Sequence, residues 1–225
     1  MMTERLWGIL TDSFPKMLEY AFTATLPLTV LSFALAITAA LAVALIQYAH
    51  VKVLSQICRF YIWVTRGTPL LVQLYIVFYG LPKVGIVMSA FPAAVIVLGL
   101  NEAAYMAETI RGTLEGVSKG QLEAGYCVGM SWGKIIWHVV LPQAMRTAFP
   151  ALSNSMIAML KETSMAATIT VMELFRQAQV INGRVYEPLA LYIEAAVIYL
   201  IFCTVLTWLQ HLGEKRLASY GGAKA

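Results

Sequence analysis

The sequence predicts an all-α polytopic membrane protein, a bundle of about five transmembrane helices that forms a single domain over residues 1–225. Of the 225 residues, 60% are hydrophobic and only 12% are charged, whereas soluble domains carry about 25% charged residues. Residues 21–46 contain no charged side chain, and in residues 189–212 the only acidic or basic residue, apart from His211, is Glu194. Each stretch exceeds the ~20 residues that cross a bilayer's hydrocarbon core.

Five apolar segments are interpreted as spans, and all should be helices because lipid-exposed segments must satisfy their own backbone hydrogen bonds. The first and fifth follow directly from hydropathy. The second is expected to break at Arg66-Gly67-Thr68-Pro69, where proline removes a backbone donor. The second, third and fourth carry charges near mid-span, which leaves their ends less sharply defined. In chain order the spans are 21–48, 57–81, 91–107, 149–172 and 189–212.

The N-terminal residues 1–19 differ from these spans. Their apolar residues follow a mostly helical spacing, and charged residues fill the gaps. This pattern predicts an interfacial helix that lies on the membrane. A frayed tail is the alternative for the first few residues.

Lysine and arginine collect on one side of a five-span chain, which predicts its orientation by the positive-inside rule. The other side holds Arg5, Lys16, Lys83, Arg176 and Arg184. The N-terminus is therefore expected outside and the C-terminus in the cytoplasm. The residues on the predicted cytoplasmic side are Lys52, Arg59, Arg111, Lys119, Lys134, Arg146, Lys215, Arg216 and Lys224.

The longest polar interval, residues 108–146, is interpreted as a helical cytoplasmic segment. Gly125, Gly129 and Gly133 recur every four residues, which would place three positions without side chains on nearly one helical face. Another backbone could approach such a face closely. Pro142 should end or bend the helix before the chain re-enters the membrane.

This interval also carries a motif. Glu123-Ala124-Gly125, then Gly129, then Val139-Val140-Leu141-Pro142 after a nine-residue gap resemble the signature loop of bacterial ABC-importer permeases. The family pattern is Glu-Ala-Ala, three residues, Gly, nine residues, Ile, any residue, Leu-Pro, so Gly125 and Val139 depart from it. In that family the loop forms a coupling helix that docks in a cleft of the cytoplasmic ATPase. An ordinary amphipathic loop is the alternative. The resemblance implies an ATPase-coupling role for Glu123, Ala124, Gly125, Gly129, Leu141 and Pro142.

Further blocks resemble the polar amino-acid branch of the same family, at residues 66–73, 104–112 and 160–164. Residues 163–179 look most like cystine permeases. The resemblance covers nearly the whole chain from the first span to Leu212. It implies a membrane subunit of an ATP-driven amino-acid importer in the bacterial cytoplasmic (inner) membrane, with L-cystine as first choice and arginine, histidine or glutamine as alternatives.

The resemblance also implies partners: a cytoplasmic ABC ATPase dimer, an extracytoplasmic amino-acid-binding protein and a second permease subunit, identical or closely homologous. The chain itself should hold no cofactor and should not be an enzyme. A P-loop needs four residues between its glycines and a hydroxyl after the lysine, whereas Gly129 and Gly133-Lys134-Ile135 have three intervening residues and no hydroxyl. ATP and Mg²⁺ would therefore be bound by the partner ATPase.

Polar residues at comparable predicted depth in the second, third and fourth spans mark a candidate substrate pathway. An ionisable group there costs about 2.5–3.5 kcal/mol on insertion scales, so it calls for a reason. Carboxylates suit the ammonium of an amino acid, while Arg66, Lys161 or the donors of a broken helix suit its carboxylate. The alternative is that Arg66, Lys161, Glu102 and Glu162 form structural ion pairs. The candidates are Arg66, Thr68, Gln73, Asn101, Glu102, Lys161, Glu162, Thr163 and Ser164.

Other function classes fit the sequence less well. The basic residues are scattered and form no patch suited to nucleic acid. Cys58, Cys127 and Cys203 match no metal-binding spacing, so no metal site is expected. A secondary transporter would use the charges within the spans for proton coupling, but such folds usually show internal repeats, and none is seen. An intramembrane enzyme with Glu102 or Glu162 as general base would lack a nucleophile or metal set.

Overall fold

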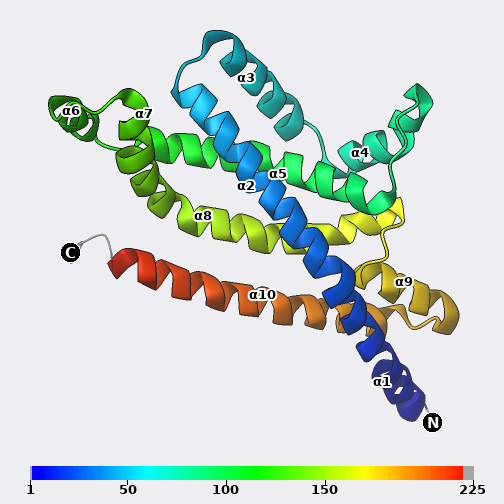
Figure 1. Cartoon of the computed structure of the whole chain (residues 1–225). Helices are drawn as coiled ribbons and strands as arrows, with labels where there is room; N and C mark the ends of the chain where they lie inside the picture. The colour runs from blue at the N-terminus through cyan, green and yellow to red at the C-terminus, as the bar shows by residue number, and fades with distance from the viewer. Residues whose placement is uncertain (1, 220–225) are drawn as a thin grey trace.

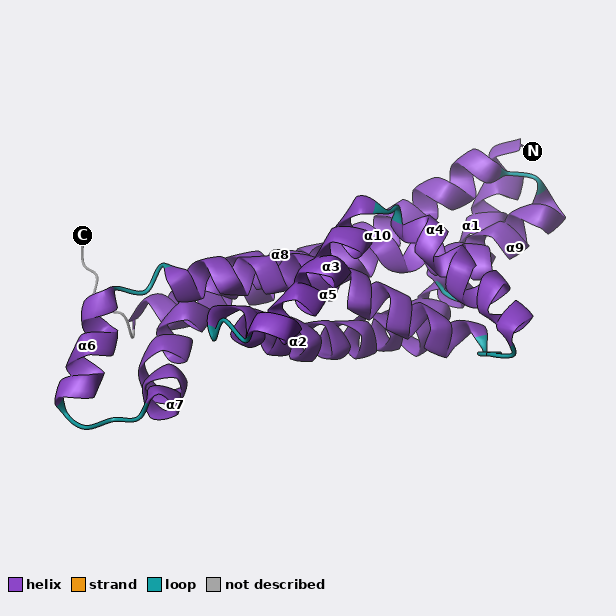
Figure 2. Ribbon diagram, turned by 90° about the horizontal axis from the view of Figure 1, so that it is seen from above, coloured by secondary structure: helices purple, strands orange, loops and turns teal. Residues whose placement is uncertain are grey.

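The computed structural model describes residues 2–219, and every regular element in that range is helical (Figure 2). Met1 and residues 220–225, which include Lys224 and the C-terminus, lie outside the described residues. Three π-helical turns and two 3₁₀ segments join some of the helices: Ala21–Thr25, Ile76–Gly80 and Ile136–Val140 are π-helical, and Leu81–Val84 and Thr163–Ile169 are 3₁₀. The α-helices are α1 Met2–Tyr20, α2 Leu26–Tyr48, α3 Lys52–Gly67, α4 Leu70–Tyr75, α5 Ala90–Glu115, α6 Lys119–Cys127, α7 Trp132–Ile135, α8 Leu141–Glu162, α9 Leu174–Val185 and α10 Pro188–Ser219.

The first two helices are continuous, because the π turn Ala21–Thr25 joins α1 to α2 without a break (Figure 1). The structure thus gives no boundary between residues 1–19 and the first predicted span. α1 packs against α9 and α10 through an apolar cluster that includes Met17 and Leu174. The Ser13 hydroxyl donates a hydrogen bond to the Glu194 carboxyl of α10. That residues 1–19 lie in the membrane interface stays a prediction.

Among the described residues, three helices are long and apolar enough to cross a bilayer: Glu4–Tyr48, Ala90–Glu115 and Pro188–Leu217. They correspond to the predicted first, third and fifth spans. The second span breaks where the sequence predicts, because α3 ends at Gly67 while Thr68 and Pro69 are extended, with ψ of 143° and 138°. The predicted fourth span, 149–172, differs from the structure. Its regular helix begins at Leu141, ends at Glu162 and continues as a 3₁₀ segment.

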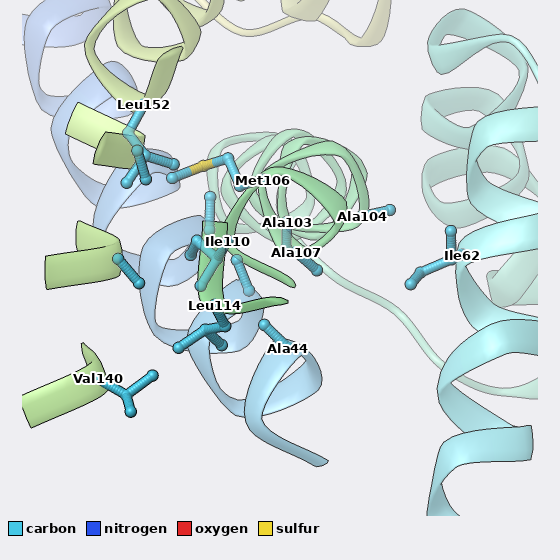
Figure 3. Packing of buried hydrophobic residues seen from close by; sticks show 14 of the residues in the cluster. Ala44, Ile62, Ala103, Ala104, Met106, Ala107, Ile110, Leu114, Val140 and Leu152 are labelled. Atoms are coloured by element: carbon cyan, nitrogen blue, oxygen red, sulfur yellow. The ribbon is translucent and has the colours of Figure 1, made fainter. Parts of the chain in front are cut away.

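Small side chains bring α2 and α5 together at the centre of the bundle. Ala36, Ala40 and Ala44 recur every four residues on α2 and are fully buried in one cluster with Ala103 and Ala107 of α5. Figure 3 shows part of this cluster, in which residues of α5 lie between α2, α3 and α8. Close backbone approach through small residues is the usual way in which helices pack within a membrane.

Gly99 permits the same approach further along α5. A Cβ placed on Gly99 would lie 2.8 Å from Cδ2 of Leu35 and 3.0 Å from the backbone oxygen of Ser32. The backbone oxygen cannot move aside without shifting α2, so we expect Gly99→Ala to lower the free energy of unfolding by about 1–3 kcal/mol. Thermal unfolding of the detergent-solubilised chain measures this change. Gly112→Ala is the control within α5, since no atom lies within 4 Å of its added Cβ. Equal losses in the two variants would contradict this packing argument.

The predicted cytoplasmic interval 108–146 is helical, but it is divided differently from the prediction. α6 and α7 form a hairpin that projects beyond the other helices (Figure 2). Gly129 lies in the turn between them with φ of +78°, a backbone conformation that glycine adopts without steric cost. The prediction that Gly125, Gly129 and Gly133 share one helical face is therefore wrong.

Pro142 does not end the helix, contrary to one of its two predicted effects. The chain stays helical from Trp132 to Glu162, and the π turn Ile136–Val140 ends two residues before the proline. Because the helix runs through it, Pro142 removes one interior i→i−4 hydrogen bond, and the adjacent π turn is the kind of local adjustment that accommodates a proline within a continuous helix. The hairpin is thereby joined to α8 by continuous helix.

Candidate functional site

A cavity of about 660 Å³ opens where the break between α3 and α4 faces α5 and α8. The break shapes one wall, because the extended Thr68 and Pro69 lie outside the helical hydrogen-bond ladder. Irregular backbone at membrane depth is tolerated where it lines a cavity of this kind. The lining residues are Arg66, Gly67, Thr68, Pro69, Leu70, Asn101, Glu102, Tyr105, Ser155 and Glu162.

This cavity gathers most of the charged candidates from three separate spans. Arg66 comes from the end of α3, Glu102 from α5 and Glu162 from the end of α8, and Thr68 and Asn101 line the same space. Glu102 is only 8% exposed. The site thus offers one guanidinium and two carboxyl groups within a partly enclosed volume.

Gln73 lies beside the cavity and links two of its walls, the α3–α4 break and α5, by hydrogen bonds. Its Nε2 donates to the Thr68 hydroxyl at 2.9 Å and to the backbone oxygen of Thr65 at 2.8 Å, so the side chain bridges the break. Its Oε1 accepts a hydrogen bond of 3.1 Å from Nδ2 of Asn101 on α5. Gln73 therefore holds the α3–α4 break against α5 and does not line the cavity itself.

Three other candidates are directed away from this cavity. Lys161 and Ser164 line a separate cavity of about 590 Å³ between α8 and α10, together with Tyr199 and Cys203. Thr163 is fully buried, and its hydroxyl donates to the backbone oxygen of Leu160 at 2.7 Å. The structure therefore does not bring these residues together with Glu102.

The alternative of structural ion pairs does not match the geometry. Within residues 2–219, no ion pair within 4.0 Å joins any two of Arg66, Lys161, Glu102 and Glu162. The Arg66 guanidinium instead lies over the ring of Tyr105, with Cζ 5.1 Å from the ring centroid. Arg66 thus forms no ion pair within 4.0 Å among the described residues, while its charge interacts with the Glu108 carboxylate and its guanidinium lines the cavity.

Sequence reasoning missed two polar residues of the cavity, Tyr105 and Ser155. Tyr105 follows Glu102 by three residues, and Ser155 precedes Glu162 by seven, which places each pair on one helical face. Helical periodicity applied to the two carboxylates is the signal that would have found them.

The residues predicted to couple to an ATPase lie on and beside the projecting hairpin. Glu123 and Ala124 are exposed on α6, whereas Gly125 is buried against Ile135. Leu141 and Pro142 open α8. Apolar side chains are exposed around the hairpin, among them Tyr126, Val128, Trp132 and Trp137.

The family described as "Binding-protein-dependent transport system inner membrane component" matches residues 36–219. The L-cystine transport system permease protein TcyB of Bacillus subtilis (strain 168) is 45% identical, over 95% of this chain and 92% of its own length. The probable amino-acid permease protein YxeN of the same organism is 38% identical, over 94% and 96%. A crystal structure of an amino acid ABC transporter with histidines superposes with a TM-score of 0.80 at 36% identity, over 90% of this chain and 98% of that one.

Proposed function

The chain belongs to the family of binding-protein-dependent transport system inner membrane components, and on this basis we propose that it is the membrane subunit of an ATP-driven importer of a polar amino acid, with L-cystine as first choice. The observation that carries the proposal is the cavity at the α3–α4 break, in which Arg66, Glu102 and Glu162 line one space. Its volume, about 660 Å³, is that of a small-molecule site. The relative TcyB, at 45% identity, supports the choice of L-cystine.

The charges of the cavity suit a zwitterion. Glu102 and Glu162 would accept hydrogen bonds from the substrate ammonium, while Arg66 would donate to its carboxylate, and charge-assisted bonds of this type are the strongest available. Thr68 and Asn101 add neutral hydrogen-bonding groups. L-cystine carries an ammonium and a carboxylate at each end, so either end offers the charges that these residues would recognise.

The chain would work with separate proteins. An ABC ATPase dimer that binds ATP and Mg²⁺ would dock on the α6–α7 hairpin, and a binding protein would deliver the amino acid from outside. A second permease subunit, identical or closely homologous, would complete the pathway. The hairpin lies at the same end of the molecule as the C-terminal end of α10 (Figure 2), which carries Lys215 and Arg216. This arrangement supports a cytoplasmic C-terminus and an external N-terminus.

The second candidate is the same machinery for arginine, histidine or glutamine. It is favoured by the similarity to an amino acid ABC transporter solved with histidines. A secondary transporter is a weaker candidate, and proton-driven uptake by the purified chain alone would indicate it.

The test is ATPase stimulation in a reconstituted complex of the chain with its ATPase and binding protein, titrated with L-cystine, arginine, histidine and glutamine. We expect L-cystine to give the largest stimulation at the lowest concentration. Stimulation by one of the other amino acids alone would reassign the substrate. Failure of the chain to associate with an ATPase would reject the importer function.

A further inference from the structure

A groove follows the seam between α8 and α10, which run side by side in opposite directions (Figure 1). We use the name α8–α10 groove for two neighbouring cavities of this seam that share Phe149 as a wall. The cavity lined by Lys161 and Ser164 lies further along the same seam. A polar cavity of about 440 Å³ lies where α8 begins and α10 ends, and it contains Gln143, Arg146, Thr147 and Glu214. An apolar cavity of about 360 Å³ lies further along α8 and is also lined by α2. We refer to the cavity of about 440 Å³ as the mouth of the groove and to that of about 360 Å³ as its interior.

The mouth offers an unpaired positive charge. In the part of the chain that the structure describes, Arg146 forms no ion pair within 4.0 Å. Glu214 lines the same mouth, but its carboxyl is engaged within α10. It accepts a 2.9 Å hydrogen bond from Nε2 of Gln210 and lies 3.3 Å from Nδ1 of His211. Pro150, four residues after Arg146, cannot donate to the Arg146 carbonyl. The mouth thus presents a guanidinium for an anion and a backbone acceptor beside it.

The interior is apolar and extends about halfway across a bilayer. Phe33 and Ile37 of α2, Leu152 and Met156 of α8, and Leu206 and Leu209 of α10 line it. From residue 146 to residue 157 the helix rises about 16 Å at ~1.5 Å per residue, roughly half of a ~30 Å hydrocarbon core. The groove therefore has the depth of one lipid leaflet.

The outer face of α10 indicates that lipid, rather than water, surrounds this seam. Leu200, Ile201 and Val205 are each at least half exposed. Trp208, six residues before Glu214 on α10, is 60% exposed, and tryptophan is enriched at a membrane–water interface. The mouth would then lie at headgroup level, with the interior beneath it.

We propose that the α8–α10 groove binds an anionic phospholipid, with the phosphate held by Arg146 and an acyl chain in the apolar cavity. The guanidinium matches the phosphate in charge and geometry. The apolar interior matches an acyl chain. This site is distinct from the cavity at the α3–α4 break, with which it shares no residue, and it does not depend on which amino acid is transported.

The experiment is native mass spectrometry of the full-length chain purified in detergent and exchanged with dioleoylphosphatidylglycerol or dioleoylphosphatidylcholine. We expect one phosphatidylglycerol to be retained in preference to phosphatidylcholine. Arg146→Gln should lower its retention about fivefold, the effect of one basic residue at an anionic membrane surface. Arg146→Lys, which keeps the charge, should retain most of the binding. Ser153→Phe, which fills the apolar cavity without touching Arg146, should also lower retention.

The matched control is Lys215→Gln, because Lys215 is exposed at the same end of the chain and lines neither cavity. Equal losses in Arg146→Gln and Lys215→Gln would overturn the proposal in favour of diffuse charge attraction. Equal retention of the two lipids would contradict the proposal, because it would show that the groove binds acyl chains without selecting an anionic headgroup. Displacement of the lipid by millimolar inorganic phosphate would show an anion site without acyl-chain recognition. Cross-linking of a second copy into the seam, with no lipid retained, would assign the groove to a protein interface.

Discussion

Glutamine in place of Glu102 should lower L-cystine uptake by the reconstituted importer at least about tenfold while the chain stays folded. A hydrogen bond to a charged group is worth about 1.5–3 kcal/mol, and about 1.4 kcal/mol is a factor of ten. Glu102 is 8% exposed and lines the cavity at the α3–α4 break, so water would compensate poorly for the lost charge. Glutamine keeps the size of the side chain. Glu162→Gln should act in the same direction, and the double variant should be nearly inactive.

Uptake and substrate-stimulated ATPase activity measure this effect, and Lys161→Gln is the matched control. Lys161 is adjacent to Glu162 in sequence, but it lines the other cavity. Its replacement removes a charge at similar depth and should leave uptake close to that of the unaltered chain. Loss of uptake in Lys161→Gln, with both glutamate variants active, would place the substrate in the cavity that Lys161 and Ser164 line. A lowered unfolding temperature in Glu102→Gln, with normal uptake, would assign Glu102 a structural role.

Lys161 and Glu162 show that the depth of a residue in a span does not predict which cavity its side chain lines. Counting residues along a span places both at one depth, but consecutive residues of an α-helix point about 100° apart because a turn holds 3.6 residues. They therefore line different cavities. The break at Arg66-Gly67-Thr68-Pro69 was predictable because its cause is local, namely the missing donor of Pro69. Which residues face that break depends on how α5 and α8 pack, and this packing has no local signal.

The continuous α1–α2 helix and the α6–α7 turn illustrate the same limit. Nothing in the residues Ala21–Thr25 marks a π turn, so the sequence predicts the amphipathic residues 1–19 and the apolar span after them as separate elements. The spacing of Gly125, Gly129 and Gly133 fits one helix equally well. Only the structure shows that Gly129 turns the chain with a positive φ, which reverses the direction of α7 relative to the predicted continuous helix.

Valine in place of Gly125 should nearly abolish ATP-driven uptake, because Gly125 is the contact at which α6 meets α7. A Cβ at Gly125 would lie 2.7 Å from Cγ1 and 2.9 Å from Cδ1 of Ile135, a fully buried residue. Such overpacking costs about 1–3 kcal/mol, and it can be relieved by separating α6 from α7. The apolar residues around the hairpin would then no longer form one surface for the proposed ATPase. Uptake and co-purification of the ATPase should therefore fall together, whereas binding of substrate in the cavity at the α3–α4 break should persist.

Gly133→Val is the matched control, since it makes the same change on the neighbouring helix, where no atom lies within 4 Å of an added Cβ. It makes the same glycine-to-valine change in helix propensity, which by itself is slightly favourable, so a loss seen only in Gly125→Val comes from the contact with Ile135. The double variant Gly125→Val/Ile135→Ala moves the bulk from one helix to the other and should recover much of the lost coupling. If Gly125→Val supported normal ATPase association and uptake, the α6–α7 hairpin would not be the element that transmits force. If the double variant were as inactive as Gly125→Val alone, the glycine would be needed for a contact with the partner rather than for the closure of the hairpin.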